Sequence, residues 1–384
     1  MQALELYIHI PFCVRKCYYC DFLSGVSDEN RREEYVKALL TEIRMCAGEC
    51  EKYTVTSIFI GGGTPSLMQG ARIERILEEI RRGYVLDKGV EITIEMNPGT
   101  VDEEKLAAYK RAGINRLSIG LQSAENEELK KIGRIHTWEQ FLHTWQLVRN
   151  MGFQNVNVDI MSALPGQSVA GYERTLQRVL SLPDPPEHIS AYSLIVEEGT
   201  DFYRWQEEGK LDLPGEDEDR QMYHLTKKLL AEKGYERYEI SNYAKPGFAC
   251  AHNCGYWKRA EYLGLGLGAA SLLKNVRFHN TESLEKYLAN PCGCREDVHV
   301  LTDGEQIEET LFLGLRLTMG ISEKEFVGCF SRTLDEIYGD VIEKNTQNGL
   351  LRWTKQGEDR WLSLTEKGLD VSNYVMAQFL LEEE

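Results

Sequence analysis

No stretch of the 384-residue sequence approaches the roughly 20 consecutive apolar residues that a membrane-spanning helix requires. The N-terminus lacks the charged, then apolar, then small-residue order of a secretory signal. Internal repeats and low-complexity regions are also missing. These absences predict a globular protein of the cytoplasm, long enough for one large domain and a smaller one.

Positive charge is scarce. The 44 Lys and Arg residues are outnumbered by 61 Asp and Glu residues, so the formal net charge is −17. Surfaces that bind nucleic acid neutralise phosphates with Lys and Arg. We therefore expect no nucleic-acid partner, although the net charge does not exclude a local basic patch.

The ten cysteines are too few for a disulfide-stapled secreted scaffold of this length. Most of them cluster, at positions 13, 17 and 20, then 46 and 50, 250 and 254, and 292 and 294. This clustering is more typical of metal chemistry, or of reduced thiols in a reducing compartment.

Short apolar runs alternate with longer amphipathic stretches over the first 195 residues. Strands are predicted at 4–10, 55–60, 90–95, 114–120, 154–160 and 188–195. Helices are predicted between them at 31–45, 71–82, 103–112, 124–132, 138–151 and 169–181. Strand–helix alternation of this kind predicts a parallel sheet in an α/β fold.

Distinctive residues stand where these strands end. Three cysteines follow the first strand, GGGTPS follows the second, and Glu95, Gln122 and Asp159 lie at the ends of the next three. In a barrel such residues converge on one face, whereas an open doubly wound sheet gathers them at one crevice. We favour an incomplete TIM-like (βα)6 barrel.

The pattern changes beyond residue 200. An acidic helical stretch (201–233) precedes an aromatic-rich segment (235–257) that is predicted to be a loop. The last segment of about 85 residues is predicted to contain strand, turn, strand and helix, as in a small winged-helix-like α+β module. We therefore predict a barrel-like domain at 1–235, a linking region at 236–295 and a C-terminal module at 296–384.

The segment PFCVRKCYYCDF contains Cys13, Cys17 and Cys20, one thiolate too few to close a tetrahedral site. A structural zinc site would need a fourth ligand nearby, but His9 lies within a strand, and Cys46 and Cys50 fall on a helix. Thiolates also bind iron–sulfur clusters, which usually take four cysteines. Three of them can hold three corners of a 4Fe-4S cubane and leave one iron open.

The CX3CX2C motif after the first strand resembles that of the radical S-adenosylmethionine (SAM) superfamily. The resemblance implies that the amino and carboxylate groups of SAM chelate the open iron. Matching positions lie in GGGTPS, EMNPGT, SIGLQS, LKKIGRIH and VDIMSALPGQ. The SAM-lining residues implied in this way are Tyr7, Gly62, Gly63, Thr64, Glu95, Gln122, Arg134 and Asp159.

The whole chain is similar to the oxygen-independent coproporphyrinogen oxidase group, including EETLFLGLRLTMGIS near residue 308. The oxidases carry CX3CX2CXC, whereas Phe22 stands here in place of the fourth cysteine. They also have a longer N-terminal extension, and both differences match the HemW-type heme chaperones. The segment HNCGYW (252–257) fits the HNXXYW pattern of that subfamily.

This resemblance implies a heme site at His252, Asn253, Tyr256 and Trp257, with His252 as axial ligand. From the residues alone, His-Asn beside Tyr-Trp is more often a packed, hydrogen-bonded corner than a heme site. Cys250 and Cys254 bracket His252 and leave the identity of the iron ligand open.

The expected function is to bind heme and pass it to acceptor hemoproteins, including respiratory enzymes of membranes, with no catalytic residue assigned. Whether SAM is cleaved and whether the protein is a homodimer stay open. One alternative is an enzyme that dehydrogenates coproporphyrinogen by radical chemistry. A radical enzyme acting on RNA is another, which the net charge of −17 opposes.

Overall fold

The computed structural model describes residues 1–381, and its first half alternates strands and helices as the sequence predicts. Most boundaries lie within a few residues of the predicted ones. The elements are β1 (Gln2–Ile10), α1 (Glu29–Cys46), β2 (Tyr53–Gly62), α2 (Gly70–Gly83), β3 (Leu86–Met96), α3 (Glu103–Arg111), β4 (Arg116–Gln122), α4 (Asn126–Lys131), α5 (Trp138–Asn150), β5 (Val156–Ser162), α6 (Val169–Leu180) and β6 (His188–Ser193).

Shorter elements follow before the C-terminal module. They are α7 (Asp201–Glu207), α8 (Glu216–Glu232), β7 (Glu236–Arg237), β8 (Asn242–Ala244), α9 (Ala251–Trp257), β9 (Tyr262–Leu265), β10 (Ala270–Leu273), β11 (Val276–Asn280), α10 (Leu284–Ala289) and β12 (Arg295–Val300). The predicted loop over 235–257 is therefore wrong at its end, because HNCGYW lies within α9.

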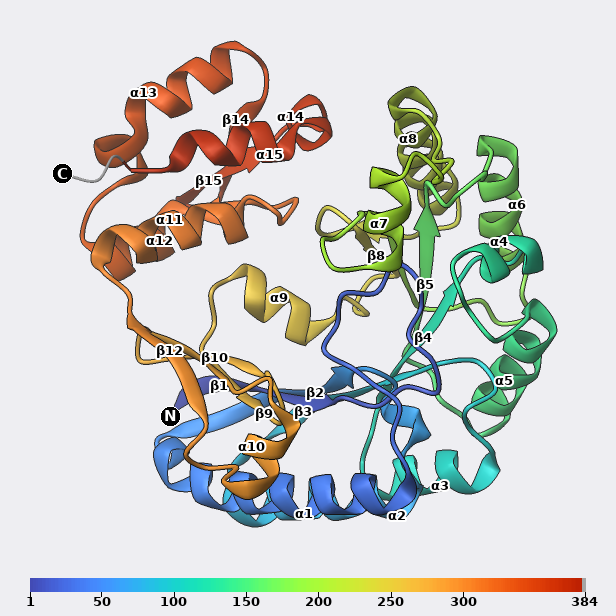
Figure 1. Ribbon diagram of the computed structural model, residues 1–384. Helices are drawn as coiled ribbons and strands as arrows, with labels where there is room; N and C mark the ends of the chain where they lie inside the picture. Colours follow the sequence, from blue (N-terminus) through green and yellow to red (C-terminus); the bar gives the residue numbers. More distant parts are fainter. Residues whose placement is uncertain (382–384) are drawn as a thin grey trace.

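A twelve-stranded sheet runs in the order β12-β11-β10-β9-β1-β2-β3-β4-β5-β6-β8-β7. Strands β1 to β6 pair in parallel, and β9 is also parallel to β1. Because β1 pairs with β9 and β6 pairs with β8, the sheet is an incomplete barrel, as predicted. Figure 1 shows α1, α2, α3, α5 and α6 following its outer face.

The two end strands of this sheet differ from the long central ones. β7 has two residues. β12 carries Arg295, Glu296 and Asp297, and its pairing with β11 is interrupted by a register shift, with Asp297 at φ 51°. A bulge and closely spaced charges therefore mark one edge, and a very short strand the other.

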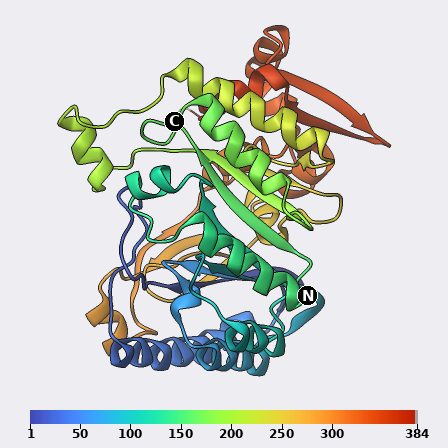
Figure 2. The same cartoon turned by 90° about the vertical axis from the view of Figure 1, so that its right-hand side faces the viewer.

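The C-terminal module has its own three-stranded antiparallel sheet in the order β13-β15-β14. Figures 1 and 2 both place it at the opposite end of the molecule from α1. Its elements are α11 (Asp303–Gly314), β13 (Ile321–Ser322), α12 (Glu323–Phe330), α13 (Leu334–Gln347), β14 (Leu351–Gln356), β15 (Asp359–Leu364), α14 (Glu366–Asp370) and α15 (Ser372–Met376).

Two separate hydrophobic clusters account for these parts. The larger lies between the twelve-stranded sheet and its helices, with residues such as Ile8, Ile60 and Ile119 fully buried. The second holds the C-terminal module together around Leu311, Leu362 and Phe379. Among residues 1–381, no helix is both long and apolar enough to cross a membrane.

A buried carboxylate joins α1 to the β9–β11 region. Glu42 is 2% exposed and accepts hydrogen bonds from Gly266 N (2.8 Å), Tyr287 OH (2.6 Å) and Asn280 Nδ2 (2.6 Å). Burial raises the pKa of Glu42 to about 7. A buried donor that loses its acceptor retains its full desolvation penalty, so these three bonds hold the β9–β11 region against α1.

We expect Glu42→Ala to lower the free energy of unfolding by about 3 kcal/mol, because three buried donors lose their acceptor. Urea denaturation followed by circular dichroism measures this loss. Lys37→Ala, at an exposed position of the same helix, is the control and should change stability by less than about 0.5 kcal/mol. Equal stability of the two variants would contradict the structural role of Glu42.

Candidate functional site

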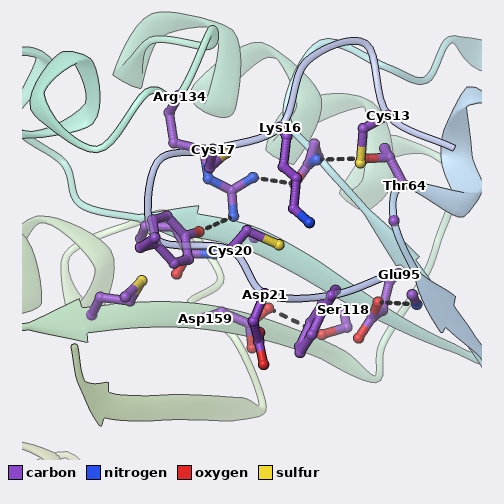
Figure 3. Close-up of a pocket in the computed structure, with 18 of the residues that line it drawn as sticks. Cys13, Lys16, Cys17, Cys20, Asp21, Thr64, Glu95, Ser118, Arg134 and Asp159 are labelled. Atoms are coloured by element: carbon purple, nitrogen blue, oxygen red, sulfur yellow. Dashed lines mark hydrogen bonds between the residues drawn. The ribbon is translucent and has the colours of Figure 1, made fainter. Parts of the chain in front are cut away.

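A pocket of about 510 Å³ opens at the carboxyl ends of the parallel strands. Figure 3 shows cysteines from the loop after β1 on one side of it, and Glu95, Ser118 and Asp159 from the strands on the other. Ten of the residues predicted from the sequence line it: Cys13, Cys17, Cys20, Gly62, Gly63, Thr64, Glu95, Gln122, Arg134 and Asp159. Parallel strand ends meet at one face, so residues distant in sequence lie together here.

The cysteine loop is anchored through its backbone. Cys13 N donates to Gly25 O (2.9 Å), and Tyr18 N donates to Ile132 O (3.2 Å) after α4. Tyr18 O accepts from Phe202 N of α7 (3.0 Å). The rings of Tyr18 and Tyr19 pack against a small hydrophobic cluster that includes Ile132 and Phe202. The loop is therefore held against α4 and α7 with its thiols at the pocket.

The electrostatics of Cys17 and Cys20 favour the protonated form of these two thiols. Burial raises the pKa of Cys17, although the positive charge of Arg134 lowers it in part. Burial also raises the pKa of Cys20, to about 11. A metal group bound here would have to displace these protons. Among residues 1–381, no three His, Cys, Asp or Glu side chains lie close enough to hold a single metal ion.

The donor set nevertheless fits an iron–sulfur cluster with an open corner. The three sulfurs are soft ligands and face one pocket of sufficient size, together with polar groups that surround it. Arg134 supplies a second observation, because its Nε is buried and has no hydrogen-bond partner within residues 1–381. A buried donor without a partner is costly and indicates that a ligand completes the site.

The glycine segment after β2 is needed for packing inside the protein. A Cβ on Gly62, which has a φ of +108°, would lie 2.6 Å from the His9 ring. One on Gly63 would lie 2.7 Å from Phe12 O. Gly63 N donates to Ile10 O (2.9 Å), so the segment lies directly against the base of the cysteine loop.

Two carboxylates lie on the strand side of the pocket (Figure 3). Burial, followed by the charge of Asp159, raises the pKa of Glu95 to about 8, while Gly62 N donates to Glu95 (3.2 Å). Burial also raises the pKa of Asp159, which accepts from Asn157 Nδ2 (2.8 Å). Glu95 keeps acceptor capacity toward the pocket and can bond the hydroxyl groups of a ligand.

Arg134 crosses the pocket opposite these carboxylates. Its Nη1 donates to Asn97 Oδ1 (2.8 Å) and its Nη2 to Tyr19 OH (2.8 Å). Gln122, with a φ of +70°, accepts from Tyr192 OH (3.1 Å). These contacts fix the positions of both side chains at the rim of the strand ends.

Sequence reasoning missed Asn97, Ser118 and Arg116. Asn97 Nδ2 donates to Thr64 Oγ1 (3.0 Å), so it connects the glycine segment to Arg134. Arg116 is 2% exposed at the start of β4. Asn97 is a polar residue directly after β3, the same signal that identified Glu95, whereas Ser118 lies near the start of β4. Arg116 begins a strand and gave no such signal.

The HNCGYW segment lies on α9, next to this pocket. His252 is 1% exposed, its Nδ1 lies 2.8 Å from Ser57 Oγ, and its ring stacks on Phe59 at 5.1 Å. Its Nε2 is buried and has no hydrogen-bond partner within residues 1–381. Burial lowers the pKa of His252 to about 3, so the imidazole is neutral near pH 7.

Two further pockets divide the remaining predicted residues. Tyr7, His252, Asn253 and Tyr256 line one of about 270 Å³, which shares Gly62, Glu95 and Asp159 with the cysteine pocket. Tyr7, Tyr256 and Trp257 line another of about 490 Å³. Tyr7 is therefore outside the cysteine pocket itself.

Phe22 lines all three pockets and is 56% exposed. An apolar ring therefore lies where the three pockets meet. Cys250, by contrast, is buried beside Glu91 (3.4 Å), and burial raises its pKa to about 12.

A second carboxylate lies beneath α9. Glu5 is 4% exposed, and its Oε2 lies 3.7 Å from His252 Nδ1. A Cβ on Gly255 would overlap the carboxylate of Glu5, so a larger residue at this helix position would force that buried side chain to move. Burial raises the pKa of Glu5 to about 8. A hydrogen bond from Ser57 lowers this pKa, and the negative charge of Glu91 raises it further.

Comparisons with known proteins agree with this architecture. A family model described as the radical SAM superfamily matches residues 7–179, and one described as the HemN C-terminal domain matches 301–371. A solved structure of coproporphyrinogen III oxidase (HemN) from Escherichia coli, described as a radical SAM enzyme, has a TM-score of 0.84 at 21% identity. That alignment covers 100% of this chain and 91% of the other and shows the shared fold.

Curated relatives are similar over nearly their whole length. A heme chaperone HemW of Lactococcus lactis is 37% identical, with 98% of this chain and 97% of the relative covered. A protein of the same name from Bacillus subtilis is 36% identical, with 98% and 99% covered.

The raised pKa of Glu5 predicts a pH-dependent stability. An acid whose pKa is raised by folding stabilises the protein below its unfolded pKa and loses that contribution as pH rises through the folded value, here about 8. We expect the free energy of unfolding of wild type to fall as the pH rises from 6 to 9. This fall should exceed that of Glu5→Gln by about 2 kcal/mol, because the variant cannot ionise at this position. Urea denaturation across this range measures it, and parallel pH profiles would contradict the assignment.

Proposed function

The chain belongs to the HemW family of radical SAM proteins, and from this premise we propose that it is a heme chaperone. In this proposal it binds heme at α9 and transfers it to acceptor hemoproteins in the cytoplasm or at respiratory membranes. The observation that carries the proposal is the position of HNCGYW, whose His252, Asn253, Tyr256 and Trp257 line pockets adjoining the cysteine pocket.

A 4Fe-4S cluster and SAM are the groups that the superfamily implies for the cysteine pocket. Cys13, Cys17 and Cys20 would hold three irons, and SAM would complete the fourth. Bound SAM, if it were reductively cleaved, would supply a 5′-deoxyadenosyl radical. The protein's own contribution is to orient SAM through the glycine segment, Glu95, Gln122, Arg134 and Asp159, which line the pocket around it.

The state of His252 supports its role as iron ligand. When Ser57 Oγ accepts from Nδ1–H (2.8 Å), the lone pair of Nε2 is left available. The low pKa keeps this nitrogen deprotonated at physiological pH. Tyr256 packs edge-on against His252 at 4.7 Å, so a porphyrin would have to displace or stack on this ring.

Coproporphyrinogen dehydrogenation is the alternative function, favoured by the likeness to the HemN structure, which at 21% identity concerns the fold alone. Phe22 at the position of the oxidases' fourth cysteine opposes it. Phe22 adds an exposed apolar ring where all three pockets meet, which suits a hydrophobic ligand.

We expect the variant Cys13→Ala, Cys17→Ala, Cys20→Ala to bind almost no 4Fe-4S cluster after anaerobic reconstitution, because the three thiolate ligands are removed. Iron and sulfide analysis and the visible absorption spectrum measure the loading. The variant Cys292→Ala, Cys329→Ala removes two exposed thiols elsewhere and should load normally. Normal loading of the triple variant would refute the ligand assignment.

We expect His252→Ala to bind hemin about tenfold more weakly and with a shifted Soret band, because iron loses its imidazole ligand. Absorbance titration with hemin measures both. His143→Ala, at an exposed position of α5, is the matched control. An unchanged Soret band and affinity in His252→Ala would remove this residue from the site.

The same preparation, reconstituted anaerobically with SAM and a reductant, separates the two functions. We expect no conversion of coproporphyrinogen while hemin binds in the micromolar range or tighter. Formation of protoporphyrinogen would refute the chaperone proposal in favour of the enzymatic one.

A further inference from the structure

Two arginines that share one carboxylate partner are among the residues that line the apolar pocket of about 490 Å³. Its walls include Tyr7 from β1, Phe22 from the cysteine loop, Trp257 from α9 and Leu313 from α11. Arg259, in the turn after α9, and Arg277, on β11, also line it. The pocket thus combines aromatic and aliphatic walls with two positive charges, and none of the sequence motifs drew attention to these arginines.

One carboxylate bridges the two guanidinium groups. Arg259 Nε donates to Glu309 Oε2 (3.0 Å), and Arg277 Nη2 donates to Glu309 Oε1 (2.6 Å). Arg259 also donates to Asn275 Oδ1 (2.9 Å), and Arg277 to Tyr262 OH (3.1 Å). Two cations facing one anion leave this cluster with a net positive charge at the pocket.

Both guanidinium groups retain donors for a ligand. Each has five N–H groups, and the contacts within residues 1–381 use two on Arg259 and two on Arg277. Glu309 lies on α11 four residues before Leu313, so one face of α11 supplies both the carboxylate and part of the apolar wall.

We propose that Arg259 and Arg277 bind the propionate carboxylates of heme, with the ring lying against Tyr7, Phe22 and Tyr256, which this pocket shares with the pocket of His252. The inference rests on the proposed heme-binding function and specifies its carboxylate subsite. Heme is a flat apolar ring with two carboxylates on one edge, which matches aromatic walls that end in two arginines. Guanidinium groups bind carboxylates through paired, charge-assisted hydrogen bonds.

Glu309 accepts hydrogen bonds from guanidinium groups that a propionate would also use. A propionate that binds either arginine competes with Glu309 for the same donors. Since α11 begins the C-terminal module, this competition connects heme binding to the contact between that module and β11. The neighbouring aromatic rings Tyr256 and Tyr262, whose centroids are 4.8 Å apart, stand between the arginines and His252.

The test compares hemin with hemin dimethyl ester, which keeps the ring and iron but lacks the two carboxylate charges. We expect wild type to bind hemin at least tenfold more tightly than the ester, because charge-assisted hydrogen bonds are lost. In Arg259→Gln, Arg277→Gln this ratio should fall to near one. Arg295→Gln, which removes a half-buried arginine of β12 paired with Glu49, is the matched control and should keep the ratio.

A preference for hemin that is unchanged in the double variant would overturn the subsite while leaving the chaperone proposal intact. Failure of wild type to bind either compound would refute the chaperone proposal itself. If the double variant does not fold, as judged by circular dichroism, Glu309→Gln takes its place. We expect this variant to bind hemin about threefold more tightly than wild type does, with no change in its affinity for the ester. Equal hemin affinity of Glu309→Gln and wild type would overturn the subsite.

Discussion

Strand β1 pairs in parallel with β2 on one side and with β9 on the other, and this double pairing positions every part of the site. Along β1, Glu5 lies under α9, Tyr7 faces the two smaller pockets, and the chain then leaves the sheet as the cysteine loop. The register of one strand therefore fixes the distance between the cysteine pocket and the HNCGYW helix. A shift of one residue would turn all of these side chains to the opposite face.

Burial of charge shapes the chemistry around this strand. Glu5 and Glu95 both have a pKa near 8, and Glu42 one near 7, chiefly because the surrounding protein excludes water. Such groups change protonation near neutral pH, where small changes in their surroundings have large effects. The protein carries them at positions that join elements or face pockets, which is where ionisable groups most often serve function.

The first six strands and the residues at their ends were predictable, because apolar runs of strand length are separated by amphipathic helices. Glu95 and Asp159 were found because a carboxylate that ends an apolar strand is unusual. Helix α9 was not predictable, since Gly, Asn, His and Cys favour helix weakly. It begins where Glu91 of β3 accepts from Ala251 N (3.1 Å) and His252 N (3.3 Å), a contact between residues about 160 positions apart. Sequence periodicity does not reveal such tertiary capping, nor the pairing of β1 with β9 that contributes to the arginine subsite.

The edges of the large sheet determine how two copies of the chain can associate. An exposed edge strand offers unpaired backbone groups to another molecule, and proteins discourage this with short strands, bulges and charges. At one edge β7 is two residues long, and at the other β12 combines a bulge with Arg295, Glu296 and Asp297. Growth of the large sheet by strand exchange or by continuous β-pairing across a two-fold axis is therefore disfavoured at both of its ends.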